Sequence, residues 1–227
     1  MTDHDGKRLF LGLRVSVATA NGLAQCAEQL ARRAREANLE VKWVAAASYH
    51  VTLKFLGWTR ADLLEALDDR IAAAIAGIGP FKFKTARLGA FPSLDKSTVV
   101  WAGVEDPDGA IGQLAKRIEA ATVELGFPAE TRPFHAHVTL GRVRETRLLR
   151  EVVLPMSEQM FSASTADSVI LFESETKSSG SVYKEISKIA LKTAQQAPLD
   201  TEKRQTGALE LGDETDDGWP RDRATNR

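Results

Sequence analysis

A four-residue string, His-Val-Thr-Leu, occurs twice in this chain and constrains its fold more than any other feature. The string occupies residues 50–53 and again residues 137–140. In each copy apolar side chains alternate with polar ones, the pattern of a β-strand that is buried on one face. Because side chains alternate along a strand, His50 and Thr52 share one face, as do His137 and Thr139. The repeat therefore predicts two equivalent strands, each presenting a histidine–threonine pair.

The wider pattern predicts an α+β fold with mostly antiparallel sheets. Strands are expected over residues 8–17, 40–44, 49–56, 81–88, 98–104, 134–143, 160–173 and 181–191. Helices are expected over residues 21–38, 61–76, 110–125 and 147–154. The order β-α-β-β-α-β occurs twice, so we expect two similar lobes related by internal duplication, with helices outside and the active cleft between them.

The composition changes near Thr193. The segment after it lacks periodicity, has few apolar residues and contains an acidic run at residues 213–217. Such a segment cannot bury enough apolar surface to offset its ordering entropy. We expect residues 1–193 to form the bilobed domain and residues 194–227 to form a disordered polar tail, in which Trp219 leaves a partner-binding role open.

Composition narrows the classes of function. The formal net charge of −1 excludes the global basic field of a general nucleic-acid binder, and the single cysteine excludes an internal disulfide. No segment reaches the roughly 18 apolar residues that span a membrane. Asp3 and Asp5 occupy the region where a leader peptide is positive, and Arg14 interrupts the following apolar run. We therefore expect a cytoplasmic monomer without membrane contact.

The two histidines suit phosphodiester cleavage. Imidazole titrates near neutrality, so one ring can accept a proton from water while the other donates one to the leaving alkoxide. The hydroxyls of Thr52 and Thr139 can donate hydrogen bonds to the non-bridging oxygens. We expect no cofactor and no metal. The chemical rival is a zinc site built from His50, His135 and His137, but no carboxylate or cysteine accompanies either string.

Three further residues are candidates for substrate binding. His135 shares a face with His137 and is either an extra basic contact to the substrate or a surface residue. Lys54 is in phase with His50, whereas Phe55 is expected to pack inward. Arg142 is out of phase with His137 unless a bulge intervenes, which leaves phosphate contact and a surface salt bridge equally open.

The paired H-x-T-x motifs resemble the two-histidine (2H) phosphoesterase superfamily. Within it, the chain is similar to bacterial and archaeal RNA 2',3'-cyclic phosphodiesterases, historically called 2'-5' RNA ligases. The similarity extends over about residues 7–192, and the family's usual proline before the second histidine is replaced here by Ala136. Other segments that carry the resemblance are residues 8–13, 41–44, 89–92, 100–104, 132–134, 141–142 and 171–174, with Gly180 and Tyr183.

The resemblance implies hydrolysis of a terminal 2',3'-cyclic phosphate on RNA to a 2'-phosphate. Some members also join RNA ends through 2'-5' linkages, reversibly and without ATP. It further implies that His50 is the proton donor and His137 the proton acceptor. The expected substrates are RNA ends, tRNA fragments among them, or cyclic nucleotides. Two alternatives are a phosphodiesterase for another cyclic or 2'-5'-linked nucleotide and a catalytically idle RNA-binding module.

Overall fold

A computed structural model describes residues 6–177 and 180–193 of the chain. The expected polar tail, with Trp219, lies outside these residues. The strands are β1 (Gly6–Arg14), β2 (Lys42–Trp43), β3 (His50–Arg60), β4 (Phe81–Pro92), β5 (Ser97–Glu105), β6 (His137–Arg147), β7 (Met160–Ala166), β8 (Ser168–Lys177) and β9 (Gly180–Ala190). The helices are α1 (Val17–Glu36), α2 (Leu64–Ala74), α3 (Ala110–Glu124) and α4 (Arg150–Val153), and short 3-10 turns cover Ala46–Ser48, Ala61–Leu63 and Leu154–Met156.

The strands form one sheet in the order β7-β4-β5-β6-β3-β1-β8-β9, with β2 paired to β6. Every pair of neighbouring strands is antiparallel. The two His-Val-Thr-Leu strands, β3 and β6, meet at its centre, and Val51 pairs with Val138. We call β3, β1, β8 and β9 the His50 lobe, and β6, β5, β4 and β7 the His137 lobe. The predicted α+β fold with antiparallel strands is confirmed.

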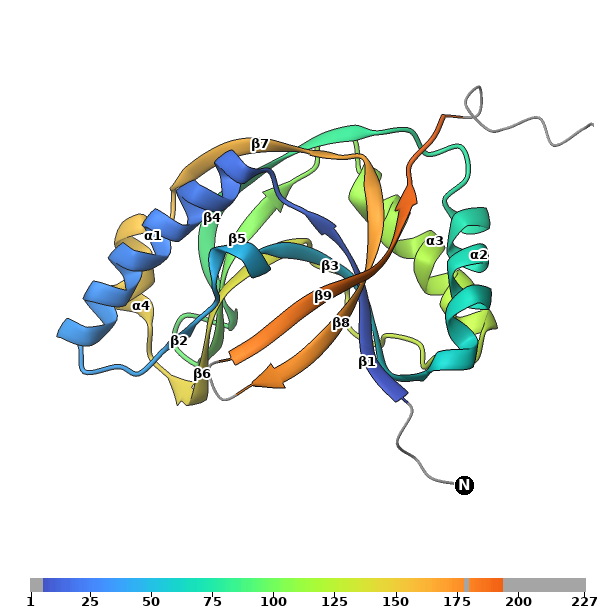
Figure 1. Cartoon of the computed structure of the whole chain (residues 1–227). Coiled ribbons are helices and arrows are strands. Elements are labelled where there is room, and N and C mark those ends of the chain that lie inside the picture. The colour runs from blue at the N-terminus through green and yellow to red at the C-terminus, as the bar shows by residue number, and fades with distance from the viewer. Residues whose placement is uncertain (1–5, 178–179, 194–227) are drawn as a thin grey trace, which may run out of the picture. The chain divides into compact units, whose positions relative to one another are not determined.

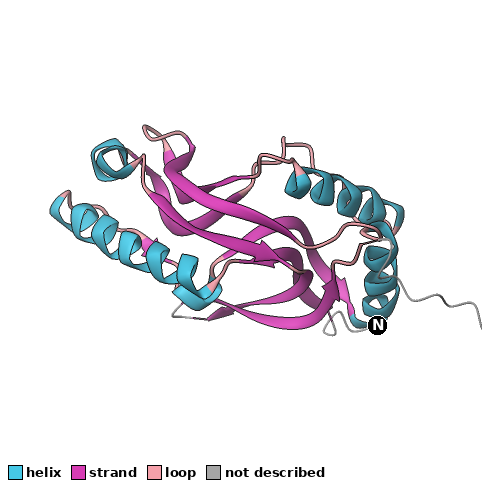
Figure 2. Ribbon diagram, turned by 90° about the horizontal axis from the view of Figure 1, so that it is seen from above, coloured by secondary structure: helices cyan, strands magenta, loops and turns pink. Residues whose placement is uncertain are grey.

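Helices α1 and α3 each pack on the lobe opposite to that of a strand next to them in the chain. Helix α1 follows β1 but packs on β7 and β6, and α3 precedes β6 but packs on β3. Figures 1 and 2 show α1 and α4 together on one side of the sheet strands, and α2 and α3 together on the other. The two lobes are therefore interlocked, and neither is a consecutive half of the chain.

Two of the predicted boundaries that the structure contradicts affect how the elements pack. Residues 160–173 are not one strand, because the chain leaves the sheet at Asp167: β7 pairs with β4 and β8 pairs with β1, in opposite lobes. The side-chain pattern of a strand does not show which strand it pairs with, so it cannot reveal such a change of partner. Helix α1 begins at Val17, four residues before Asn21, because the Ser16 hydroxyl accepts the Thr19 N–H at 3.1 Å and caps the helix.

The core lies beneath the two central strands. Val51 and Val138 are fully buried, as is Leu140, and Leu53 is nearly so. Apolar side chains from one face of α1 and α3 pack into the same core, including Leu23, Leu30, Ile111 and Ile118. This packing fixes the two strands from below, so the residues on their opposite face are presented on a rigid support.

Candidate active site

His50 and His137 are the first residues of β3 and β6 and lie on neighbouring strands. Each stands one position before the valine of the Val51–Val138 pair. Both side chains are partly buried, as are those of Thr52 and Thr139. Burial lowers the pKa of His50, and the positive charges of His137 and Arg142 act in the same direction, as expected for cationic groups that share one site. The structure therefore brings the predicted pair together.

The two imidazoles are oriented in the same way. The Nδ1 atom of His50 lies 2.7 Å from the carbonyl oxygen of Ser48, and that of His137 lies 2.7 Å from the carbonyl oxygen of His135. A carbonyl oxygen only accepts hydrogen bonds, so Nδ1 carries a proton in both rings. Nε2 is then the atom that gains and loses a proton, and in His50 it lies 3.1 Å from the Thr52 hydroxyl. This arrangement suits general acid–base chemistry.

A β-bulge follows the histidine–threonine pair in both strands. Opposite β1, the register passes from Thr52 to Lys54, so Leu53 is the extra residue. Opposite β5, it passes from Thr139 to Gly141, so Leu140 is the extra residue. A bulge shifts the alternation of side chains by one position.

The bulge in β6 brings Arg142 onto the face that carries His137 and Thr139, where its side chain is exposed. The sequence allows Arg142 to contact a phosphate bound at His137 only if such a bulge is present. The equivalent residue on β3 is Phe55, which is 56% exposed and lies 6.0 Å from the Phe10 ring between centroids. The expectation that Phe55 packs inward is wrong for the same reason.

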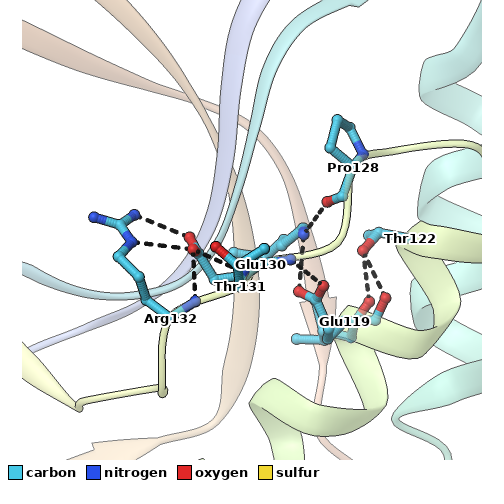
Figure 3. Close-up of polar contacts among 8 residues, drawn as sticks. Glu119, Thr122, Pro128, Glu130, Thr131 and Arg132 are labelled. Carbon is cyan, nitrogen blue, oxygen red and sulfur yellow. Dashed lines mark hydrogen bonds and ion pairs between the residues drawn. The ribbon is translucent and has the colours of Figure 1, made fainter.

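The structure contradicts the prediction that Lys54 lies on the same face as His50 and binds substrate. The bulge turns it away from His50 into the interior, where it is 5% exposed. Its ammonium group donates to the Pro128 carbonyl at 2.6 Å and lies 2.8 Å from a carboxylate oxygen of Glu119 on α3. Figure 3 shows Glu119 and Pro128 facing each other across this contact. Lys54 is therefore not among the residues available to a substrate.

The sequence carried a signal for the bulge in β6 but not for the bulge in β3. The apolar positions of the second copy are 138, 140 and 143, and Arg142 stands where a regular strand would place the third of them. In the first copy Phe55 occupies that regular position, so the alternation at 51, 53 and 55 is unbroken in the sequence, although Leu56 is the buried residue. The exchange of Lys54 for Phe55 on the exposed face was therefore hidden.

His135 lies beside His137 but outside the strand. Its ring is exposed and contacts Phe91 and Trp101, with centroid distances of 5.4 and 5.3 Å, and it lies 6.4 Å from the His137 ring. The structure thus gives His135 two connections to the site: its carbonyl orients His137, and its ring extends an aromatic surface.

Further site residues come from other strands and were missed by the sequence prediction. The ring of His50 packs on Phe10 at 4.7 Å and against Tyr183 at 5.0 Å, and the ring of His137 packs edge-on against Phe91 at 5.0 Å. Arg14 forms an ion pair with Glu185, and its guanidinium lies 5.5 Å from the Phe172 ring centre. The sequence signal for Arg14 was a charge inside an apolar strand.

The site disfavours positive charge while it is empty. Burial lowers the pKa of His50 to about 4, against the hydrogen bond to Ser48, and the charges of His137, Arg142 and Arg14 act in the same direction as burial. Burial also lowers the pKa of His137, again with a contribution from Arg142. A bound anion would favour the protonated imidazoles. Arg142 and the two imidazoles therefore form a site suited to an anionic group.

Among residues 6–177 and 180–193, no three histidine, cysteine, aspartate or glutamate side chains are grouped so that they could hold a metal ion. The zinc set of His50, His135 and His137 is thus not supported. No helix in the same residues is long and apolar enough to cross a membrane.

The family model for the 2'-5' RNA ligase superfamily matches residues 23–176 of the chain. The match contains both histidine–threonine pairs. The chain belongs to the 2'-5' RNA ligase superfamily. The predicted family is therefore confirmed over most of the length to which the resemblance extended.

Relatives in this superfamily align with most of the chain. An RNA 2',3'-cyclic phosphodiesterase of Archaeoglobus fulgidus is 31% identical over 147 residues, which are 64% of this chain and 81% of the relative. One of Methanothermobacter thermautotrophicus is 27% identical over 172 residues, 74% of this chain and 92% of the relative.

Solved structures of similar proteins share the fold. The structure of TT0787 from Thermus thermophilus has a TM-score of 0.68 at 23% identity, and E. coli LigT in its apo form has a TM-score of 0.64 at 21% identity. Each comparison covers 82% of this chain and 98% of the other. At this identity the likeness establishes the fold.

Proposed function

We propose that this protein hydrolyses a terminal 2',3'-cyclic phosphate on RNA to a 2'-phosphate, with His50 and His137 as general acid and base. The observation that carries the proposal is the matched pair of imidazoles on the central strands, each with Nδ1 fixed by a carbonyl and Nε2 left for proton transfer. The relatives named RNA 2',3'-cyclic phosphodiesterase support the same reaction.

The proposed reaction uses one water molecule. Nε2 of His137 accepts a proton from water as its oxygen attacks the phosphorus. The bond between phosphorus and O3' breaks, and Nε2 of His50 donates a proton to O3'. The product carries a 2'-phosphate and a 3'-hydroxyl, and solvent exchange restores both imidazoles. The assignment of donor and acceptor follows the family resemblance.

Polar groups on the same strands bind the phosphate in the proposed reaction. The hydroxyls of Thr52 and Thr139 donate hydrogen bonds to the non-bridging oxygens, which gain charge in the transition state. Arg142 neutralises the phosphate and, through the bulge in β6, shares the face of His137. Arg14 adds a second positive charge near His50.

Aromatic groups favour a nucleotide over a simple phosphodiester. Phe55 is exposed next to Phe10 in the His50 lobe, and His135 extends the rings of Phe91 and Trp101 in the His137 lobe. Aromatic faces of this kind bind bases by stacking, which tolerates any base. We infer that one of these surfaces contacts the terminal nucleoside, which carries the cyclic phosphate, and the other contacts the nucleoside before it.

RNA ends with a cyclic phosphate, tRNA fragments among them, are the proposed substrates. Both histidines come from one chain, so the proposed active form is a monomer. The RNA substrate favours a cytoplasmic location. Where 2'-5' joining operates, the 5'-hydroxyl of a second RNA end takes the place of water: His137 accepts its proton as the 5'-oxygen bonds to phosphorus, the bond between phosphorus and O3' breaks, and His50 donates a proton to O3'.

The test is incubation with the four nucleoside 2',3'-cyclic phosphates, a short RNA that ends in a cyclic phosphate, and 2'-5' oligoadenylate. Chromatography that separates 2'- from 3'-phosphates identifies the broken bond. We expect 2'-phosphate alone, with the RNA preferred. Exclusive 3'-phosphate would reverse the assigned leaving group. Cleavage of only 2'-5' oligoadenylate would favour the alternative phosphodiesterase, and binding without cleavage would favour the idle RNA-binding module.

A further inference from the structure

The seam between the two lobes is narrow. Strands β3 and β6 share the registered pair Val51–Val138, whereas β3 pairs with β1 along residues 50–60. The placement of His137 relative to His50 must therefore depend on other contacts that join the two strands or the segments leading into them.

Lys54 makes such a contact. It lies on β3, three residues beyond Val51, and its buried ammonium group reaches Pro128 and Glu119. Pro128 belongs to residues 127–136, which have no helix or strand and lead from α3 directly into His137. We call these residues the entry loop. One buried cation therefore connects β3, which carries His50, to the segment that leads into β6 and His137.

The entry loop is held by a chain of polar contacts that begins at this ion pair. Glu119 pairs with Lys54 through one carboxylate oxygen and accepts the Glu130 N–H at 2.8 Å through the other. Glu130 in turn accepts the N–H groups of Thr131 and Arg132 and binds the Arg132 guanidinium at 3.0 Å. Figure 3 shows these groups in sequence from Glu119 to Arg132. The same loop contains His135, whose carbonyl orients His137.

The motif itself does not demand this cation. The position equivalent to Lys54 in the second copy is Gly141, which also follows the bulge. There a Cβ would lie 2.8 Å from Val41 and 2.9 Å from Trp43, so β2 and the residue before it fill the space instead. The role of Lys54 therefore depends on a structure that only β3 contacts, and that structure is the entry loop.

We propose that Lys54 is a positioning residue that sets the orientation of His137 through the ion pair between its buried ammonium group and Glu119. When this tie is lost, the entry loop is free to shift, and the hydrogen bond from His137 Nδ1 to the His135 carbonyl weakens. Small displacements of a catalytic group reduce turnover strongly, because the reacting atoms no longer meet in line. The effect on turnover rests on the proposed function; the effect on His137 does not.

The test compares Lys54→Met with Lys7→Met in the full chain. Methionine keeps most of the length and the apolar stem of lysine but removes the charge. Lys7 forms an ion pair of the same 2.8 Å length with Glu173, but that pair joins β1 to β8 within one lobe. We expect Lys54→Met to lower kcat by about tenfold to a hundredfold with KM changed by no more than about twofold. Lys7→Met should keep the wild-type kcat.

A spectroscopic readout separates positioning from loss of stability. In NMR spectra of the imidazole nitrogens, Lys54→Met should shift the Nδ1 signal and the pKa of His137, and leave those of His50 near their wild-type values. Glu119 offers a graded series, because Glu119→Gln keeps an acceptor for the Glu130 N–H and Glu119→Ala does not. We expect kcat to fall less in Glu119→Gln than in Glu119→Ala.

A folded Lys54→Met protein with wild-type kcat and unshifted His137 signals would overturn the proposal. If Lys54→Met does not fold, the Glu119 series decides, and wild-type kcat in both of its members would overturn the proposal. If the wild-type protein cleaves no cyclic phosphate, the proposed function fails, but the His137 signals still report whether Lys54 positions that ring.

Discussion

His50 and His137 are held by equivalent hydrogen bonds: Nδ1 of each lies 2.7 Å from the carbonyl oxygen of the residue two positions earlier. The bond fixes the ring orientation and the tautomer through the backbone alone, so neither histidine needs a carboxylate partner. Their surroundings differ, because Phe10 and Tyr183 pack on His50 whereas Phe91 packs on His137. Equivalent geometry in unequal surroundings allows the two imidazoles to hold opposite protonation states.

Replacement of either histidine should remove most activity. We expect His50→Ala and His137→Ala each to reduce kcat/KM by roughly 10²–10⁴-fold, the usual contribution of a general acid or base. The double variant should lose far less than the product of the two effects, because the pair acts as a unit. Steady-state rates on a cyclic-phosphate RNA measure both effects, with Arg150→Ala, which removes an exposed ion pair with Asp95, as the control. Wild-type turnover in either single variant would refute the assignment.

Anion binding should raise the pKa of His50. In the ligand-free protein burial lowers this pKa from its ordinary value of 6.5 to about 4. A bound phosphate stabilises the imidazolium, so the pKa moves upward, towards the value that a proton donor needs near neutrality. NMR titration of the imidazole with and without inorganic phosphate measures the change. An unchanged or lowered pKa would argue against His50 as the donor.

The same shift has a kinetic consequence. Both rate profiles should be bell-shaped, and their apparent pKa values belong to the coupled pair. The profile of kcat/KM reports the free enzyme, whereas that of kcat reports the substrate complex. Because substrate raises the pKa of the acid, the alkaline limb should lie at higher pH in kcat than in kcat/KM. Coincident limbs would show that the substrate anion does not act on the acid.

Chelators should leave the rate unchanged. No group of three potential metal ligands was found in the described part of the chain, and the proposed acid and base need no metal. Rates before and after dialysis against EDTA, and after addition of Zn²⁺ or Mg²⁺, make the comparison. Activity lost in EDTA and restored by one ion would replace the two-histidine mechanism with a metal-dependent one.

Phe55 should contribute to substrate binding. Its ring is exposed next to Phe10 on the face that carries His50. Loss of a stacking surface weakens binding by about 1–3 kcal/mol per base, so Phe55→Ala should raise KM with little change in kcat. Trp58→Ala, which removes a more exposed aromatic residue farther along β3, is the matched control. Equal KM values for the wild type and Phe55→Ala would exclude a stacking role for this ring.

Deletion of residues 194–227 should leave activity and folding nearly unchanged. The prediction follows from the polar, aperiodic composition of that segment, since such segments seldom contribute to a packed core. Thermal unfolding and steady-state rates of the shortened chain test it. A large loss in either quantity would assign a docking role to the tail and direct attention to Trp219.

The sequence alone determined the family, the fold class and the two histidine–threonine pairs. These follow from local patterns: a repeated string, period-two alternation and apolar helix faces, all of which depend on neighbours in the chain. It also placed His137 and Thr139 on a common face correctly, because no bulge separates them.

Only the tertiary structure decided what lies around those pairs. The bulges at Leu53 and Leu140 exchange Lys54 for Phe55 and bring Arg142 into the site, and bulges are defined by the partner strand rather than by the strand itself. Phe10, Arg14 and Tyr183 reach His50 from strands distant in sequence. Their convergence depends on which strands pair. Strand pairing is determined by burial across the whole sheet, so a local sequence pattern does not predict it.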